Sequence, residues 1–454
     1  MQPADALGAR GARRTPSLGE MRRRLLEHVR TPLHRDGYAL AFNSAFTAAT
    51  GLLYWVIAAR SYSAHAVGLN SALISSMMFL AGIASLNFPN ILVRFLPHSG
   101  NRTSQRIVGS YCVAAAIAVC AVAVFIAGIT AWAPHLRSLR SDRGLQLWFA
   151  LSTLGWCLFM IQDSVLTALG RAIWVPIENA AFSLVKLGLL AALATIMSGY
   201  GIFVSWTIAM LLSVIGVNVI VFRRLAPRHS AASEHAPLSL RDRAFVRYFA
   251  ADYTCSVAWI SATNLMPVIV TAVDGATTNA YWALAYAVVL PLYAFAQNIG
   301  TSLMLHGAKD PASLASLTRK ATVQGARVLV PAVVLLVVAA PYLLSLFGQS
   351  YADRSAAVLR LLAVGALPNF VVALAASVAR VQRRLRRAVI ALTTEAVLSL
   401  SLATPLLHAM GVTGAAVAFV GSQCLVAAAL ILTSTNWLGA TDDGPGQARP
   451  GGAT

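Results

Sequence analysis

Twelve long apolar runs constrain the fold of this 454-residue chain more than any other feature. Hydrophobic residues make up 58% of the sequence and charged residues 11%, which is more apolar surface than a soluble core can bury. The runs lie at 38–59, 66–88, 107–132, 145–169, 173–197, 200–222, 248–273, 279–303, 324–347, 357–379, 388–409 and 412–436. Each holds at least about 20 residues, enough for a helix to cross a bilayer. The sequence therefore predicts an all-α, polytopic membrane protein with about 12 transmembrane helices.

The two halves of the chain share a local sequence pattern. The segment Ala66-Val67-Gly68-Leu69-Asn70-Ser71-Ala72 in the second run has a counterpart in Ala276-Thr277-Thr278-Asn279-Ala280-Tyr281 in the second half. Pairing Asn70 with Asn279 gives an offset of 209 residues. Because each half contains an even number of spans, both copies enter the bilayer in the same direction, and a symmetry axis runs along the membrane normal. We expect two pseudo-symmetric six-helix lobes around a central cavity, a plan that suits an alternating-access carrier.

The expected organisation has five parts. An arginine-rich arm (1–37) precedes the N-lobe (38–222), a linker (223–247) leads to the C-lobe (248–436), and a short tail (437–454) follows. Of the 35 Lys and Arg residues, 28 fall in segments on the side of the N-terminus and six on the other side. Basic residues beside a span resist translocation, so the arm, the linker, the tail and both termini are expected in the cytoplasm.

Composition and motifs narrow the function classes. The net charge of +19 arises from short basic loops beside spans, which predicts contact with anionic membrane lipids and no nucleic acid. The five cysteines lack CxxC spacing and the nine histidines fall in loops or at span ends, so no metal or cofactor site is predicted. The sequence contains no Walker-type motif and no nucleophile beside an obvious base, which argues against an enzyme.

Lys186 is the basic residue that falls deep inside a predicted span. It follows Ile173 by 13 residues, which is about 20 Å along a helix. A charge at such depth costs roughly 2.5–3.5 kcal/mol on insertion scales, so it should face a cavity or a partner. One interpretation is a cavity cation that contacts an anionic cargo, and the other is a lysine paired with a neighbouring helix.

Four acidic residues lie near the expected cytoplasmic ends of spans, namely Asp163, Glu178, Asp252 and Glu395. One interpretation is a belt of ion pairs, formed with Arg94, Arg171, Arg247 and Arg387. The other is that some of these carboxyl groups bind a coupling proton or cation.

Amide and aromatic side chains also occur within the spans. Asn43, Asn70 and Asn179 are candidates to bind sugar hydroxyls in a cavity, although hydrogen bonds between helices are the commoner role of such amides. The aromatic belt at the membrane interface is the expected place of five aromatic residues near span ends, namely Tyr54, Trp55, Trp132, Trp148 and Trp206.

Short motifs in both halves resemble a known family. The first half contains Gly51-Leu52-Leu53-Tyr54-Trp55-Val56-Ile57-Ala58-Ala59-Arg60, Val67-Gly68-Leu69-Asn70-Ser71-Ala72 and Val93-Arg94-Phe95-Leu96-Pro97. The second half contains Leu346-Phe347-Gly348-Gln349-Ser350-Tyr351, Val358-Leu359-Arg360-Leu361-Leu362 and Gly411-Val412-Thr413-Gly414-Ala415-Ala416. Together they are similar to bacterial polysaccharide-biosynthesis membrane proteins, the oligosaccharide flippases of the multidrug/oligosaccharidyl-lipid/polysaccharide (MOP) exporter superfamily.

The resemblance implies a twelve-helix carrier in the bacterial plasma (inner) membrane. Such a carrier moves a polyprenyl-pyrophosphate-linked oligosaccharide across the membrane for cell-envelope polysaccharide synthesis, with glycan-synthesis enzymes as partners. The resemblance also implies that basic groups in the N-lobe cavity contact the pyrophosphate, and Lys186 and Arg94 are the candidates here. A single deep cation is fewer than the family's pattern leads one to expect, which leaves the charge of the cargo open.

Two other functions are compatible with this plan. The first is a cation-coupled drug antiporter of the MATE kind, although the run 38–59 lacks the acidic residue that such proteins usually carry in an early helix. The second is a membrane scaffold for a glycan-synthesis complex that transports nothing itself. Replacing Lys186 separates a carrier from a scaffold, because only the carrier should lose translocation.

Overall fold

The computed structural model describes residues 32–232, 243–310 and 313–433, and their side chains over 46–230, 246–310 and 313–433. The tail 437–454, most of the arm 1–37, the middle of the linker 223–247 and the side chain of Asn43 lie outside these ranges. The chain divides into two compact units, 1–48 and 49–454. All contacts described below lie within the second unit.

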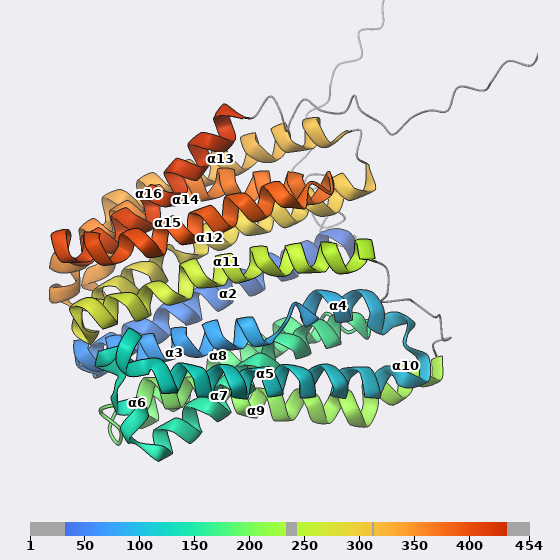
Figure 1. The fold of residues 1–454 in the computed structure, drawn as a ribbon, viewed down its shortest axis with the longest axis horizontal. Helices are drawn as coiled ribbons and strands as arrows, with labels where there is room; N and C mark the ends of the chain where they lie inside the picture. The colour runs from blue at the N-terminus through green and yellow to red at the C-terminus, as the bar shows by residue number, and fades with distance from the viewer. Residues whose placement is uncertain (1–31, 233–242, 311–312, 434–454) are drawn as a thin grey trace, which may run out of the picture. The chain divides into compact units, whose positions relative to one another are not determined.

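Every described element of secondary structure is helical, which confirms the predicted all-α class (Figure 1). The first half contains α2 (Pro32–Ser61), α3 (Ala64–Ala84), α4 (Phe88–Phe95), α5 (Thr103–Trp132), α6 (Ser138–Ser141), α7 (Arg143–Ala168), α8 (Trp174–Leu193), α9 (Gly201–Ile220) and α10 (Ala226–Ala232). The second half contains α11 (Arg243–Asp274), α12 (Ala276–Lys309), α13 (Leu314–Ser345), α14 (Gln349–Val381), α15 (Leu385–Met410) and α16 (Val412–Leu432).

The number of membrane spans agrees with the prediction. Within the described residues, 11 helices are long and apolar enough to cross a membrane. Each of them matches one of the predicted runs from 66–88 onward, and α2 occupies the position of the first run. The chain is therefore a multi-pass membrane protein with about twelve spans.

The second predicted run, 66–88, is shorter than expected. Helix α3 ends at Ala84, and Leu86 and Asn87 adopt left-handed backbone conformations with φ of 44° and 61° before α4 begins at Phe88. Asn tolerates this conformation better than most residues, and Pro89 fits the first turn of a new helix because its missing N–H has no partner there anyway. The break redirects the chain after α3 and starts a separate helix.

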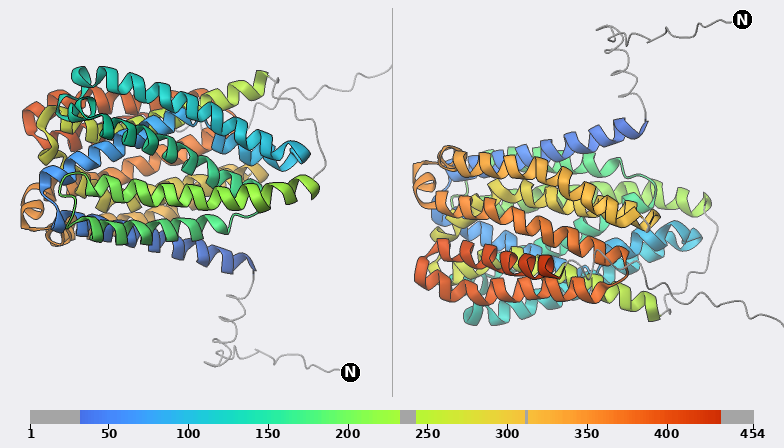
Figure 2. Two further views of the ribbon diagram at one scale, coloured as in Figure 1. Left: turned by 90° about the horizontal axis from the view of Figure 1, so that it is seen from below. Right: turned by 90° about the horizontal axis from the view of Figure 1, so that it is seen from above.

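The two halves meet through α3. In the first half, α7 contacts α3, α4, α5, α8 and α9. In the second half, α14 is the central helix and contacts α12, α13, α15 and α16, which run beside one another in Figures 1 and 2. Helix α3 belongs to the first half by sequence, but it packs along both α11 and α12 of the second half. The residue boundaries of the two lobes stay a prediction.

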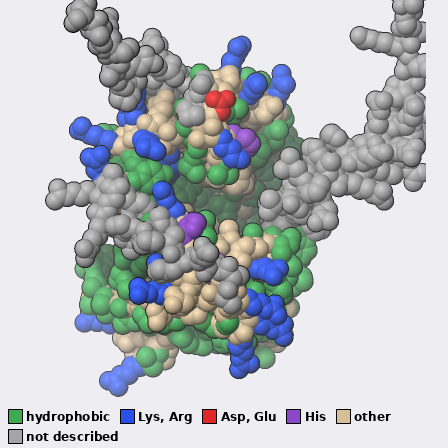
Figure 3. Space-filling view, turned by 90° about the vertical axis from the view of Figure 1, so that its right-hand side faces the viewer, with side chains coloured by type: hydrophobic (Ala, Val, Ile, Leu, Met, Phe, Trp, Pro, Cys, Tyr) green, Lys and Arg blue, Asp and Glu red, His purple; other side chains and the backbone are tan. Residues whose placement is uncertain are grey.

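One end of the bundle is rich in arginine. We call it the arginine-rich end; it carries the connections from α3 to α5, from α12 to α13 and from α14 to α15, with Arg94, Arg106, Lys309, Arg380 and Arg387. Figure 3 shows this face, on which Lys and Arg side chains surround a hollow between the two groups of helices. The other end, with the connections from α2 to α3 and from α11 to α12, is called the opposite end.

Candidate functional site

Lys186 lies in α8 inside an enclosure of aromatic rings. Its side chain is 4% exposed. The ammonium Nζ is 3.8 Å from the ring centroid of Trp206, 4.7 Å from that of Tyr54 and 4.9 Å from that of Phe182. These rings come from α9, α2 and α8 itself, with Phe182 one helical turn before Lys186. We call Tyr54, Phe182 and Trp206 the aromatic cage.

Hydrogen bonds and ring contacts hold the cage in place. The Tyr54 hydroxyl donates to the carbonyl oxygen of Ile202 at 2.7 Å and lies 2.9 Å from Ser205 Oγ, which ties α2 to α9. The rings of Tyr54 and Trp206 meet edge to face at 5.4 Å between centroids, and those of Phe182 and Trp206 do so at 6.0 Å. The cage is therefore a built enclosure in which the position of each ring is fixed by its neighbours.

The aromatic cage offsets only part of the free-energy cost of burying the charge of Lys186. Among the described residues, no carboxylate forms an ion pair with this ammonium group, and no acceptor forms a hydrogen bond with it. A desolvated cation–π contact stabilises a cation by about 2 kcal/mol, whereas burying an ion costs several kcal/mol. The indole Nε1 of Trp206 is also buried without an acceptor in the described part of the chain. Two donors without an acceptor make this region favourable for an anion.

A second polar group lies on the same helix toward the arginine-rich end. Glu178 of α8 is 5% exposed and accepts hydrogen bonds from Gln162 Nε2 of α7 and, at 2.8 Å, from Ser213 Oγ of α9. Gln162 Oε1 accepts from Asn218 Nδ2 at 2.8 Å. Glu178 Oε2 and Asp163 Oδ1 are buried without a hydrogen-bond partner among the described residues. This cluster joins three helices of the first half and contains no basic side chain.

The second half buries a carboxyl group of its own. Glu395 of α15 is 2% exposed, and neither of its carboxyl oxygens has a hydrogen-bond partner among the described side chains. Gln423 of α16 lies next to it, but no hydrogen bond of ordinary geometry joins the two. Tyr286 and Tyr293 of α12 are close enough to interact with it electrostatically. A carboxyl group buried without a positive partner is stabilised by a bound proton or cation.

The two halves are in direct contact at the opposite end. A Cβ atom on Gly68 of α3 would lie 1.6 Å from the carbonyl oxygen of Ala276 at the start of α12, so only glycine permits this approach. Asn279 Nδ2 donates to the Gly68 carbonyl oxygen at 2.8 Å. Arg60 at the end of α2 donates to the carbonyl oxygens of Ser345 and Leu346, both at 2.8 Å, where α13 ends. These contacts close the opposite end between the halves.

A polar cluster joins the halves at the arginine-rich end. Asp252 of α11 accepts hydrogen bonds from Asn87 Nδ2 at 3.2 Å and Asn90 Nδ2 at 3.1 Å, both in the first half. Its other carboxyl oxygen forms an ion pair at 3.0 Å with Arg380 Nε at the end of α14. Tyr253 adds a hydrogen bond of 2.8 Å from its hydroxyl to the carbonyl oxygen of Ile83. We call Asn87, Asn90, Asp252 and Arg380 the inner latch.

Arg380→Gln is expected to loosen the inner latch. Without the guanidinium group the Asp252 carboxylate loses its countercharge and favours hydration over its bonds to the two asparagines. The closed state should lose about 1–3 kcal/mol, a typical cost for unpairing a buried charged group. Distances between spin labels at Val93 and Val246, in a cysteine-free background, would lengthen. Arg319→Gln, on the exposed surface of α13, is the matched control. Identical distance distributions for both variants would contradict this role.

The other predicted site residues have different surroundings. Asn70 is fully buried, and its amide donates to the carbonyl oxygens of Ala66 and Gly199 at 2.7 Å and accepts from Phe203 N at 2.9 Å, so it joins α3 to the start of α9. Asn179 is half-buried and follows Glu178 directly on α8. Arg94 is exposed on α4, which contributes no ring to the aromatic cage. The side chain of Asn43 lies outside the described residues.

One ring of the cage does not lie where the sequence predicts. Tyr54 is 0% exposed and packs against Trp206, so its expected place in the aromatic belt is wrong. The position of Tyr54 indicates a buried ring, because Tyr54 lies seven residues before the end of α2 at Ser61. A phenol at that depth needs a hydrogen-bond partner on a neighbouring helix.

Similarity to solved structures shows the fold. No family model and no curated protein matches this sequence. A multidrug resistance MATE family transporter of the MOP superfamily, in an inward-facing conformation, matches with a TM-score of 0.63 and 14% identity over 88% of this chain and 96% of that one. The lipid II flippase MurJ, in an inward closed conformation, matches with a TM-score of 0.69 and 15% identity over 87% of each chain.

A third match concerns a MOP superfamily transporter from Pyrococcus furiosus reported for the reverse polarity of its binding pocket. It has a TM-score of 0.59 and 13% identity over 90% of this chain and 96% of that one. At these identities the similarity is one of fold. The chain has the fold of MOP superfamily transporters, among which both flippases and drug exporters occur.

Proposed function

We propose that this protein is an alternating-access flippase for an anionic, lipid-linked cargo, namely a polyprenyl-pyrophosphate oligosaccharide used in cell-envelope polysaccharide synthesis. In this proposal both termini lie in the cytoplasm of a bacterium and the bundle crosses its inner membrane. The observation that carries the proposal is the buried Lys186 ammonium, which three aromatic rings enclose and no described carboxylate neutralises.

The sign of the charge favours this class of cargo. A cationic drug near Lys186 would meet a like charge in a poorly solvated enclosure, which is repulsive. A pyrophosphate group would supply the acceptor that Lys186 and the Trp206 indole lack, through charge-assisted hydrogen bonds. Lysine is a common phosphate ligand because its ammonium group acts as a compact positive charge. The side chain of Lys186 is flexible enough to move away from the rings and contact a phosphate. Arg94 would then contact the cargo at the arginine-rich end rather than beside Lys186.

A MATE-like cation-coupled antiporter is the second candidate, and the buried acids favour it. Glu178 and Glu395 each have a buried oxygen without a described partner, as a group that binds and releases a proton or cation would. The two candidates differ in cargo rather than in coupling, because a flippase can use the same carboxyl groups to draw on an ion gradient. The charge of the transported molecule therefore decides between them.

The test is a transport assay in vesicles containing the purified protein. A fluorescent polyprenyl-pyrophosphate disaccharide is placed in both leaflets, and a membrane-impermeant quencher is added outside. A flippase exposes nearly all of the probe to the quencher, whereas empty vesicles protect the inner half. Uptake of a cationic dye is measured in parallel. Movement of the dye without the lipid would establish the antiporter, and movement of neither would leave the scaffold as the explanation.

Glu395→Gln is expected to uncouple transport from an ion gradient. The amide keeps the shape of the side chain but cannot exchange a proton or attract a cation. Gradient-driven transport should fall by about 5- to 150-fold, the usual range of coupling between two sites, while cargo binding persists. Transport with and without an imposed Na⁺ or H⁺ gradient measures this. Asp353→Asn, at an exposed carboxyl group of α14, is the control. An undiminished gradient response in Glu395→Gln would exclude this carboxyl group from coupling.

A further inference from the structure

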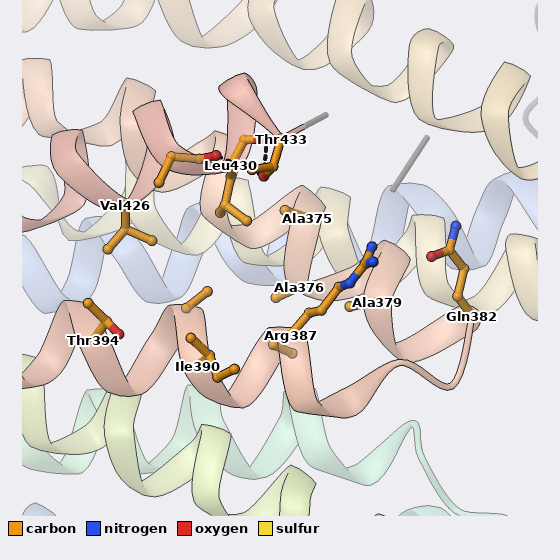
Figure 4. Close-up of a pocket in the computed structure, with 13 residues that line it drawn as sticks. Ala375, Ala376, Ala379, Gln382, Arg387, Ile390, Thr394, Val426, Leu430 and Thr433 are labelled. Atoms are coloured by element: carbon orange, nitrogen blue, oxygen red, sulfur yellow. Dashed lines mark hydrogen bonds between the residues drawn. The ribbon is translucent and has the colours of Figure 1, made fainter. Parts of the chain in front are cut away.

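A cavity separate from the aromatic cage lies within the second half, between α14, α15 and α16 (Figure 4). Its volume is about 480 Å³. Ligand pockets in proteins usually measure about 300–1,000 Å³. It is lined by Ala376 and Ala379 of α14, Ala391 of α15, and Val426 and Ala429 of α16. The walls are therefore mostly small apolar side chains, which leave room for a chain of methylene groups.

One basic side chain, that of Arg387, lines this cavity. Arg387 is exposed in the first turn of α15, and its guanidinium group extends over the cavity toward α14 in Figure 4. The turn between α14 and α15 carries five arginines within residues 380–387. At the same end Ile390 of α15 is 54% exposed and also lines the cavity, so an apolar path leads in from the surface.

We propose that this cavity binds an acyl chain of an anionic phospholipid from the leaflet at the arginine-rich end, with the lipid phosphate at Arg387. The apolar walls give water few hydrogen-bond partners, so a hydrocarbon chain is the better occupant. The charge of the mouth complements a phosphate, and arginine recognises phosphate through paired N–H donors. None of the lining residues belongs to the first half, so this lipid site is distinct from the cargo site at Lys186.

The test titrates the full chain, purified in detergent, with palmitoyl-oleoyl phosphatidylglycerol and counts bound lipids by native mass spectrometry. Arg387→Gln should weaken binding about fivefold, the contribution of one basic residue near an anionic lipid. Arg386→Gln is the matched control, because Arg386 is an exposed neighbour that does not line the cavity. Phosphatidylcholine, which carries no net charge, should bind more weakly and respond equally little to both variants.

A second pair of variants tests the apolar part of the site. Ala429→Trp fills the cavity from an exposed position and should abolish retention of phosphatidylglycerol, whereas Leu425→Trp, on the exposed surface of the same helix, should not. The proposal fails if Arg387→Gln and Ala429→Trp bind phosphatidylglycerol as the unmodified protein does. It also fails if glycerol 3-phosphate, which has no acyl chain, displaces the bound lipid as well as intact phosphatidylglycerol does. A third contrary outcome is that phosphatidylglycerol binds only after removal of residues 437–454, which would make that segment the occupant of the cavity.

Discussion

Lys186→Ala is expected to lower translocation of the lipid-linked probe by about tenfold to a hundredfold, the loss that follows when a charged hydrogen bond to a phosphate is removed. The stability of the folded protein should not decrease, because the substitution removes a poorly compensated buried charge. The melting temperature of the purified variant should therefore equal or exceed that of the unmodified chain. Loss of transport together with unchanged stability is the signature that separates a cargo-binding lysine from a structural one.

Two further variants make the Lys186 result specific. Lys309→Ala removes a lysine from the exposed end of α12 and should transport normally. Lys186→Arg keeps the charge and can still stack on the Trp206 ring, so it should retain part of the activity. The quenching assay with the pyrophosphate probe measures all three. If Lys186→Ala transports normally, or melts well below the unmodified chain, the lysine serves the fold and the proposed cargo loses its main support.

The spans were predictable because their signal is local. Each run of apolar residues has the length that a bilayer demands, and the described helices match the predicted runs with shifts of up to ten residues at their ends. The break between α3 and α4 was missed because the apolar composition continues through it. The signal that marks it is the sequence Asn87-Phe88-Pro89, in which the asparagine takes the left-handed turn and the proline starts the next helix.

The partners of the buried charges were harder to foresee. The interpretation of the acids as a belt of ion pairs named Arg94, Arg171, Arg247 and Arg387 as partners, but Asp252 pairs with Arg380 of α14. Lys186 was found from its depth alone, whereas two of the three rings that enclose it come from positions 132 residues before it and 20 after it. Such pairings depend on which helices are neighbours, and apolar helices of similar composition do not encode their neighbours locally.

The repeated pattern found in the sequence is also a contact in the structure. Gly68 and Asn70 of α3 belong to one copy, and Ala276 and Asn279 of α12 belong to the other. The two asparagines now differ in role, since Asn70 binds within its own half and Asn279 binds across to Gly68. The halves therefore touch at this repeated pattern, at the opposite end, while the inner latch joins them at the arginine-rich end. Alternating access requires these two contacts to open in turn.

Gly68→Ala is expected to keep the opposite end from closing. The new Cβ atom would lie 1.6 Å from the Ala276 carbonyl oxygen, and α3 and α12 must move apart until this distance reaches ordinary contact, 3.4 Å or more. Backbone atoms line the gap, so no side chain can rotate away to make room. Overpacking of this kind costs roughly 1–3 kcal/mol, which shifts the balance of open and closed states by about 5- to 150-fold. Spin labels at His65 and Asp274 would report a longer distance.

The comparison that isolates this steric effect is Gly216→Ala, at a position in α9 where a Cβ atom meets nothing within 4 Å. Both variants gain the same helix propensity, so only the contact with α12 distinguishes them. Gly216→Ala should leave the distance between labels and the transport rate unchanged. Gly68→Ala should slow transport, because a carrier that cannot seal one end cannot pass its cargo in alternating steps. If both variants gave the same distances between the spin labels, the contact between α3 and α12 would accommodate an extra methyl group. Closure of the opposite end would then depend on Arg60 and its hydrogen bonds to the end of α13.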